Sequence, residues 1–262
     1  MDNRPIGIFD SGLGGLTVVN AMKDALPDES FVYVGDTARI PYGEKDVDTL
    51  HSYGRQIVSF LEKEGVKAII VSCGTISSTV IEDLREEFRL PLIDVAYPGI
   101  ESALEQVKKR IGIIATEATI KSGFFQKTIK EKNPALDVEA KACPLFVPLI
   151  EEGWPNSVVT ARVVEAYLRD WQENPIDTLI LGCTHYPLLS SAIQQVLGDV
   201  PLIDMSIAAV KNTHKYLIEN GLLKKSSEIS RKFYVSGDTE KFNYMGKQIT
   251  GLPTHAQKIY WE

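Results

Sequence analysis

The sequence predicts an α/β protein that contains two related copies of one unit, each a mainly parallel sheet flanked by helices. Short apolar runs alternate with amphipathic stretches along all 262 residues, a pattern typical of consecutive βαβ units. Three short sequences also recur in the same order at nearly the same offset, which indicates a duplication of domain size. Chance similarity between short apolar strands is the alternative explanation.

The recurring sequences surround two cysteines. An apolar run that ends at Cys73 is matched by a run that ends at Cys183, 110 residues later. Two further pairs of segments match in the same order, residues 91–94 with 201–204 and residues 6–9 with 111–114. The chain is therefore expected to form a first domain from residues 1–97 and 208–262 and a second from residues 98–207.

The individual elements follow from the spacing of apolar residues and from the Gly and Pro residues between them. Apolar runs predict eight buried strands, at residues 5–10, 31–35, 67–73, 91–95, 111–115, 178–182, 201–204 and 232–236. Helical spacing predicts two buried helix faces, one with Leu50, Tyr53, Ile57 and Leu61 and one with Val163, Val164, Tyr167, Leu168 and Trp171. A further helix is expected near residues 208–220.

Composition excludes several classes of function. The formal net charge is −7, which argues against a nucleic-acid partner, because phosphate binding needs a basic face or stripe. No apolar run approaches the roughly 20 residues of a membrane-spanning helix. Residues 1–4 lack the pattern of a signal peptide, so a cytoplasmic protein without a membrane partner is expected. The three cysteines form no Cys-x-x-Cys pair, so reduced thiols are expected rather than a disulfide framework or a metal site.

Polar residues follow the predicted strands, at the sheet edge where ligands bind in open parallel sheets. The segments concerned are Asp10 to Gly15, Arg39 to Gly43, Cys73 to Thr75, Thr116 to Thr119 and Cys183 to His185. All five are expected to project into one crevice, which is therefore the candidate functional site.

The segment from Gly12 to Gly15 allows more than one interpretation. Its glycines can free backbone N–H groups to bind an anion at the start of the next helix. They can also form only a tight turn, or an imperfect dinucleotide loop with Asp36 at the position of the ribose-binding acid. Thr17 stands where the third glycine of that loop belongs, and Asp10 would repel a pyrophosphate. A nucleotide-binding protein without catalytic activity is therefore the less favoured alternative.

Cys73 and Cys183 are the candidate reactive groups. Each lies at a strand end, beside hydroxyl residues and at the expected start of a helix, where the helix dipole favours a thiolate. A phosphatase loop would need Arg six residues after the cysteine, but Thr79 and Leu189 occupy those positions. Cys143 is interpreted as a small buried hydrophobic residue.

Five segments spread along nearly the whole chain form a specific set. They are Phe9-Asp-Ser-Gly-Leu-Gly-Gly15, Pro41-Tyr-Gly43, Val71-Ser-Cys-Gly-Thr75, Ala142-Cys-Pro-Leu-Phe-Val-Pro-Leu-Ile-Glu151 and Leu181-Gly-Cys-Thr-His-Tyr-Pro-Leu188. This set resembles glutamate racemase, within the aspartate/glutamate racemase superfamily. The resemblance implies two pseudo-symmetric α/β domains with the active site in the cleft between them. It also implies a reaction without a cofactor, production of D-glutamate for peptidoglycan, and a possible homodimer.

The resemblance assigns roles by position. Cys73 and Cys183 would be the two catalytic thiols. Asp10 and His185 would exchange protons with them, and Glu151 would be an auxiliary acid. The glutamate site would be lined by Asp10, Ser11, Tyr42, Gly43, Gly74, Thr75, Thr116, Thr119, Thr184 and His185. A capping or core histidine is the alternative interpretation of His185.

The sequence departs from the family at two positions. Gly74 replaces the Asn that usually follows the first catalytic cysteine, so a side chain expected to hydrogen-bond the substrate is missing. Restoring Asn at this position is expected to tighten glutamate binding by one hydrogen bond. Tyr97 stands where family members commonly carry an acid. A racemase or isomerase that acts on aspartate or another small acid therefore remains an alternative.

Two opposed thiols suit the inversion of an α-carbon. A proton must leave one face and another must arrive at the opposite face, which two fixed groups do better than one group that swings between them. The resting enzyme then needs one thiolate and one thiol. Backbone N–H groups and Thr hydroxyls would hold the α-carboxylate and spread the charge that develops on it.

Overall fold

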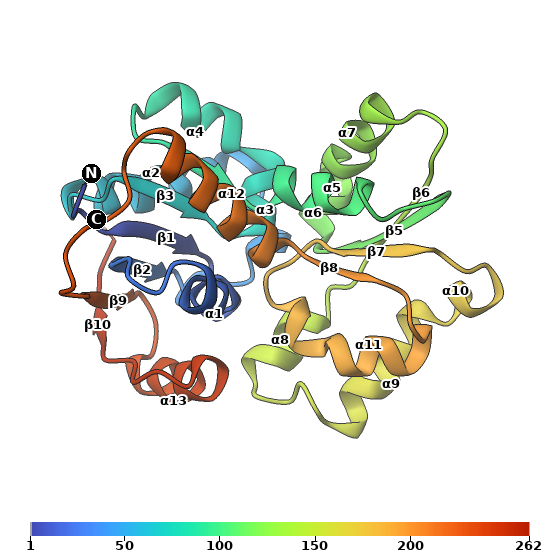
Figure 1. Cartoon of the computed structure of the whole chain (residues 1–262). Helices are drawn as coiled ribbons and strands as arrows, with labels where there is room; N and C mark the ends of the chain where they lie inside the picture. The colour runs from blue at the N-terminus through green and yellow to red at the C-terminus, as the bar shows by residue number, and fades with distance from the viewer. Residues whose placement is uncertain (1, 262) are drawn as a thin grey trace.

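Two parallel sheets flanked by helices make up the protein, as the computed structural model of residues 2–261 shows (Figure 1). In spatial order, the larger sheet contains β10 (Ala256–Lys258), β9 (Arg231–Val235), β2 (Phe31–Gly35), β1 (Ile6–Asp10), β3 (Ala68–Val71) and β4 (Leu92–Asp94). The smaller sheet contains β6 (Asp137–Ala142), β5 (Arg110–Ala115), β7 (Thr178–Leu181) and β8 (Leu202–Asp204). The predicted α/β class with two sheets is confirmed.

The two sheets repeat one topology. The order β2-β1-β3-β4 in the larger sheet corresponds to β6-β5-β7-β8 in the smaller one. The register also corresponds, because Ile6 of β1 pairs with Ala68 of β3, and Ile111 of β5 pairs with Thr178 of β7. The segments that recur in the sequence therefore occupy equivalent strands, which supports the duplication.

Most helices follow the strands in βαβ order. Those near the larger sheet are α1 (Leu16–Ala25), α2 (Val47–Lys63), α3 (Gly74–Thr79), α4 (Ile81–Glu87), α13 (Thr239–Thr250) and the 3-10 helix η1 (Tyr42–Glu44). Those near the smaller sheet are α6 (Glu117–Ser122), α7 (Phe124–Lys132), α8 (Phe146–Glu151), α9 (Val158–Leu168), α10 (Asp170–Glu173), α11 (Ser190–Leu197) and the 3-10 helix η2 (Tyr186–Leu189). Among the described residues, no helix is both long and apolar enough to cross a membrane.

Two helices cross between the halves. The helix α5 (Ala96–Leu104) follows β4 of the larger sheet but packs on β7 and β8, whereas α12 (Met205–Glu219) follows β8 but packs on β3, β4 and α1. The two helices also contact each other. One hydrophobic cluster therefore extends through both halves, with Ile8 and Ile113 among its buried members. The domain limits at residues 97/98 and 207/208 remain a prediction.

All eight predicted strands are present, but two further strands, β6 and β10, were not predicted. Both lie at a sheet edge. Their residues alternate or are mainly polar, and most are half-buried or exposed, so they lack the apolar run that identifies a buried strand. The helix predicted near residues 208–220 is α12, which begins three residues earlier.

Candidate active site

The ends of strands from both sheets enclose one cavity. Its lining consists of Ser11, Ile40, Pro41, Tyr42, Gly43, Cys73, Gly74, Thr75, Thr116, Val147, Cys183, Thr184 and His185. Ten of these residues are predicted site residues, and Ile40 and Pro41 belong to the segment from Arg39 to Gly43 that was expected to reach the crevice, whereas Val147 had not been assigned. The cavity measures only about 20 Å³, which is room for about one water molecule, so it must widen before an amino acid can enter.

The Cys73 thiol lies on the larger-sheet side of the cavity. Cys73 follows β3 and caps α3, and its side chain donates to Oγ of Ser11 at 3.7 Å. Burial, and then the charge of Asp10, raise the pKa of the Cys73 thiol to about 12. Desolvation of the sulfur thus opposes the dipole of the six-residue helix α3, which was expected to favour a thiolate at this position.

The Cys183 sulfur lies in a different environment, next to an imidazole and a carboxylate. Nδ1 of His185 lies 3.6 Å from Sγ of Cys183, and Nε2 lies 2.7 Å from Oε1 of Glu151. Burial disfavours the imidazolium, but the hydrogen bonds and charges of Cys183 and Glu151 raise the pKa of His185 well above its usual value. Burial opposes the charge of Glu151 as well, yet its bond to His185 lowers the pKa of the carboxyl group. The three residues thus form a hydrogen-bonded chain from the Cys183 sulfur to the Glu151 carboxylate.

Asp10 lies behind the cavity wall. It is fully buried, and its carboxylate accepts from the backbone N–H of Gly12 at 2.9 Å and from Oγ1 of Thr184 at 3.1 Å. Burial raises the pKa of Asp10, and the charge of His185 opposes that rise. Because Thr184 belongs to the other half of the molecule, this hydrogen bond joins the two halves beside the cavity.

Threonine hydroxyls form a second connection between the halves. Oγ1 of Thr75 lies 3.0 Å from Oγ1 of Thr116, which in turn donates to Oγ1 of Thr119 at 3.1 Å. Ser78 also donates to Thr119. Thr119 is fully buried behind Thr116 and is not among the residues that line the cavity. Thr75 and Thr116 therefore face the cavity, and Thr119 orients them from behind.

The glycine segment before α1 packs against the other half of the molecule. A Cβ atom at Gly12 would lie 2.5 Å from Oε1 of Glu151, and one at Gly14 would lie 2.5 Å from Nδ1 of His185. The N–H of Leu13 donates to the same Glu151 oxygen at 3.0 Å. These glycines therefore allow close approach to the Glu151–His185 pair.

The nucleotide-binding alternative finds no support in the arrangement around Asp36. Its carboxylate is fully buried and accepts from four donors within the protein, so it is not directed toward the cavity. A ribose-binding acid would have to present a free carboxylate to the ligand.

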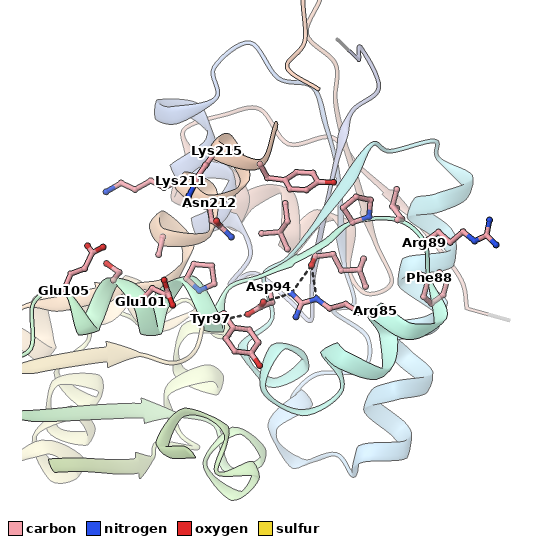
Figure 2. A pocket seen from close by; sticks show the side chains of 18 residues that line it. Arg85, Phe88, Arg89, Asp94, Tyr97, Glu101, Glu105, Lys211, Asn212 and Lys215 are labelled. Atoms are coloured by element: carbon pink, nitrogen blue, oxygen red, sulfur yellow. Dashed lines mark hydrogen bonds and ion pairs between the residues drawn. The ribbon is translucent and has the colours of Figure 1, made fainter. Parts of the chain in front are cut away.

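Tyr97 lies outside the candidate site. It lines a separate hollow of about 770 Å³ between α4, α5 and α12 (Figure 2). There its backbone N–H donates to Oδ1 of Asp94 at 2.8 Å, and its ring packs edge-on against the ring of Phe124. The hollow contains the ion pair of Arg85 with Asp94 but no cysteine, as Figure 2 shows. The family departure at Tyr97 therefore does not alter the cavity that holds the thiols.

Comparisons with known proteins agree on one family. The family model described as Asp/Glu/Hydantoin racemase matches residues 13–213. The chain is 39% identical to the glutamate racemase of Thermoanaerobacter pseudethanolicus over 96% of this chain and 95% of that protein. It is 46% identical to the glutamate racemase of Aquifex aeolicus over 82% of this chain and 84% of that protein.

A solved structure has the same architecture. The glutamate racemase of Francisella tularensis, crystallised in complex with D-glutamate, superposes with a TM-score of 0.92. The two chains are 39% identical, and the match covers 99% of this chain and 98% of the other.

Proposed function

The chain belongs to the Asp/Glu/hydantoin racemase family, and on that premise we propose that it interconverts L- and D-glutamate by proton transfer at Cys73 and Cys183. It is an amino-acid racemase. The observation that carries the two-thiol proposal is the equivalent position of the two cysteines. Cys73 follows β3 and Cys183 follows β7, and both line the same cavity from opposite halves.

The proton balance of the reaction is simple. One thiolate removes the Cα proton and becomes a thiol, while the opposite thiol donates its proton to the other face of Cα and becomes a thiolate. The total number of protons on the protein is unchanged, but their positions on Cys73 and Cys183 are exchanged. Before another turnover in the same direction, the two thiols must return to their starting states by exchange with neighbouring groups or solvent.

The surroundings of the two sulfurs suit different resting states. The raised pKa of Cys73 favours the thiol, which is the proton donor. Cys183 lies beside His185, and an adjacent imidazolium stabilises a thiolate. We infer that His185 exchanges protons with Cys183, with Glu151 holding the imidazole, and that Asp10 assists proton exchange at Cys73.

Substrate carboxylates would be bound without Lys or Arg. Neither residue type is present in the described lining of the cavity. The hydroxyls of Ser11, Thr75, Thr116 and Thr184 are the available donors, together with backbone N–H groups of the strand-end segments. Donors of this kind, fixed before the reaction, stabilise charge that develops at the carboxylate during proton removal.

An assay of optical rotation tests the substrate. The purified protein is incubated with L-glutamate and, separately, with L-aspartate. We expect the rotation of the glutamate solution to decay to zero. Decay of the optical rotation with aspartate alone would instead identify racemisation of aspartate, the alternative reaction. Gly74 is the observation behind this alternative, because a side chain usual in the family is missing there. Absence of decay with both acids would refute the glutamate and aspartate proposals.

The wider role follows from the product. We propose that the enzyme supplies D-glutamate for peptidoglycan in the cytoplasm and needs no cofactor. Expression of the chain should allow a bacterium that requires D-glutamate to grow without it, and the Cys73→Ala variant should not.

Assembly as a homodimer is a further part of the proposal. Trp154, Val158 and Val159 are all more than half exposed and lie close together in sequence, near the cavity-lining helix α8. Exposed apolar side chains in a group are typical of protein interfaces. Sedimentation velocity over a range of concentrations should show the dimer. A Val158→Asp variant should then shift the equilibrium to the monomer.

A further inference from the structure

The segment from Asp36 to Gly43 forms one wall of the cavity but contains little regular structure. It follows β2 and includes Ile40, Pro41, Tyr42 and Gly43, all of which line the cavity. Apart from the short helix η1, no regular element holds it. The backbone N–H of Asp36 donates to the carbonyl of Asp10 at 3.0 Å, but beyond Asp36 the wall is joined to the other elements mainly by side-chain contacts.

The carboxylate of Asp36 provides most of those contacts. Oδ2 accepts a short hydrogen bond from the Tyr42 hydroxyl and another from Nε of Arg39 at 2.6 Å. Oδ1 accepts from Oγ of Ser236 at 2.6 Å and from Nε1 of Trp261 at 2.7 Å. A fully buried carboxylate is stable only when its oxygens are paired, and here both oxygens have two donors each.

Trp261 also holds the wall through its ring. The guanidinium of Arg39 lies between two aromatic rings, 3.8 Å from the centroid of Tyr53 and 4.9 Å from that of Trp261. Nη1 of Arg39 donates to Gln56 of α2 at 2.6 Å. Trp261 therefore contacts the segment twice, by its N–H on Asp36 and by its ring on Arg39.

Ser236 holds the segment from the end of β9. Its hydroxyl accepts from the backbone N–H of Ala38 at 3.0 Å while it donates to Asp36. The neighbouring N–H of Gly237 donates to Oγ1 of Thr37 at 2.9 Å. Residues 236–237 and Trp261, which follow Asp36 by 200 or more positions, thus hold the segment that carries Tyr42 and Gly43.

We propose that Trp261 and Ser236 are positioning residues of the active site, which act on Tyr42 and Gly43 through Asp36. The wall they hold also contacts the opposite half, because a Cβ atom at Gly43 would lie 2.5 Å from Cβ of Thr116. Loss of either donor leaves part of a buried carboxylate unpaired and shifts Tyr42. The inference deepens the proposed function, since it assigns a role within the same cavity.

A Trp261→Phe variant separates the two contacts of Trp261. Phenylalanine keeps an aromatic ring beside Arg39 but cannot donate to Asp36. We expect KM for both glutamate enantiomers to rise about tenfold, because a hydrogen bond to a buried charge is lost, while kcat changes less than threefold. Ser236→Ala should change KM in the same direction. Tyr260→Phe is the matched control, because Tyr260 is 82% exposed, and it should leave KM unchanged.

Hydrogen exchange provides a readout that does not depend on the reaction. In Trp261→Phe, the amides of residues 37–45 should exchange faster than in the wild type, whereas those of α9 should not. Unchanged KM and unchanged exchange in both Trp261→Phe and Ser236→Ala would overturn the proposal. Faster exchange throughout the chain would overturn it too, since the role would then be general stability. Faster local exchange in a protein without racemase activity would refute the proposed function and not the positioning role.

Discussion

Nε2 of His185 lies 2.7 Å from Oε1 of Glu151, although the two residues are 34 positions apart and both are buried. Cys183 lies on the other side of the same imidazole ring. The imidazole therefore connects the Cys183 sulfur to a carboxylate that does not line the cavity.

A Glu151→Gln variant should lower the pH at which activity is lost on the alkaline side. The negative charge of Glu151 contributes to the raised pKa of His185, so its removal lets the imidazolium deprotonate at lower pH. The alkaline limb of the kcat/KM profile should shift to lower pH. Glu152→Gln, which changes an adjacent exposed carboxylate, is the control. An unchanged profile in Glu151→Gln would contradict the role assigned to the pair.

The same variant should show a pH-dependent loss of stability. Glu151 has a lowered pKa, so its contribution is present above the ordinary value of 4.5 and is lost as pH falls through the folded-state value. His185 has a raised pKa, so its contribution is complete below the ordinary value of 6.5 and is lost as pH rises through the folded-state value. The difference in unfolding free energy between wild type and Glu151→Gln should therefore be largest between these two values, at about 3 kcal/mol. Urea unfolding at several pH values measures it.

Replacement of either catalytic thiol should abolish racemisation without unfolding the protein. Cys73→Ala and Cys183→Ala each remove one proton-transfer group but little buried volume, so the unfolding free energy should fall by about 1 kcal/mol or less. Cys143→Ala is the control, because Cys143 is buried but does not line the cavity and should be dispensable for turnover. Near-normal turnover in both directions by Cys73→Ala or by Cys183→Ala would refute the two-thiol mechanism.

Isotope transfer distinguishes two thiols from one. When L-glutamate reacts in D2O, the first D-glutamate formed should carry deuterium at Cα, because its new hydrogen comes from the far thiol, which has exchanged with solvent. Unreacted L-glutamate should remain largely unlabelled at early times, because return to substrate uses the proton just removed. Mass spectrometry of the separated enantiomers measures both. Substantial protium in the first D-glutamate would indicate a single base that carries the proton across.

Adding a side chain at Gly74 should weaken activity, contrary to the expectation from the family sequence. A Cβ atom at this position would overlap the carbonyl oxygen of Gly182, so the two strand ends would have to move apart. Gly74→Ala and Gly74→Asn should both lower kcat/KM, by about tenfold or more, since overpacking of this kind costs about 1–3 kcal/mol. Steady-state kinetics in both directions tests this. A gain with Asn alone would show that the usual hydrogen bond outweighs the overlap.

The sequence predicted the elements and residues whose signal is local. The eight strands with apolar runs were found, and the strand ends with Cys73 and Cys183 lie together because duplicated βαβ units place equivalent strand ends at equivalent edges. The edge strand β6 was missed because it contains no continuous apolar run; its alternation of Val138, Ala140 and Ala142 with charged residues is the weaker signal of a half-buried strand.

Other features depend on contacts that a linear pattern does not reveal. The raised pKa of the Cys73 thiol was not foreseen, because the helix start is visible in the sequence but the burial of the sulfur is not. The contacts of Trp261 and Ser236 with Asp36 were not predicted, since about 200 residues separate the partners. No motif of fixed spacing could identify them.

The crossing of the chain at α5 and α12 determines the order in which the protein can assemble during synthesis. The four strands of the smaller sheet lie within residues 110–204, so that sheet can form as soon as this stretch has left the ribosome. The larger sheet lacks β9 and β10 until residues 231–258 follow. The larger sheet, whose first strands are translated first, is thus completed last. Until β9 has been synthesised, the edge of β2 that will pair with β9 has no partner strand.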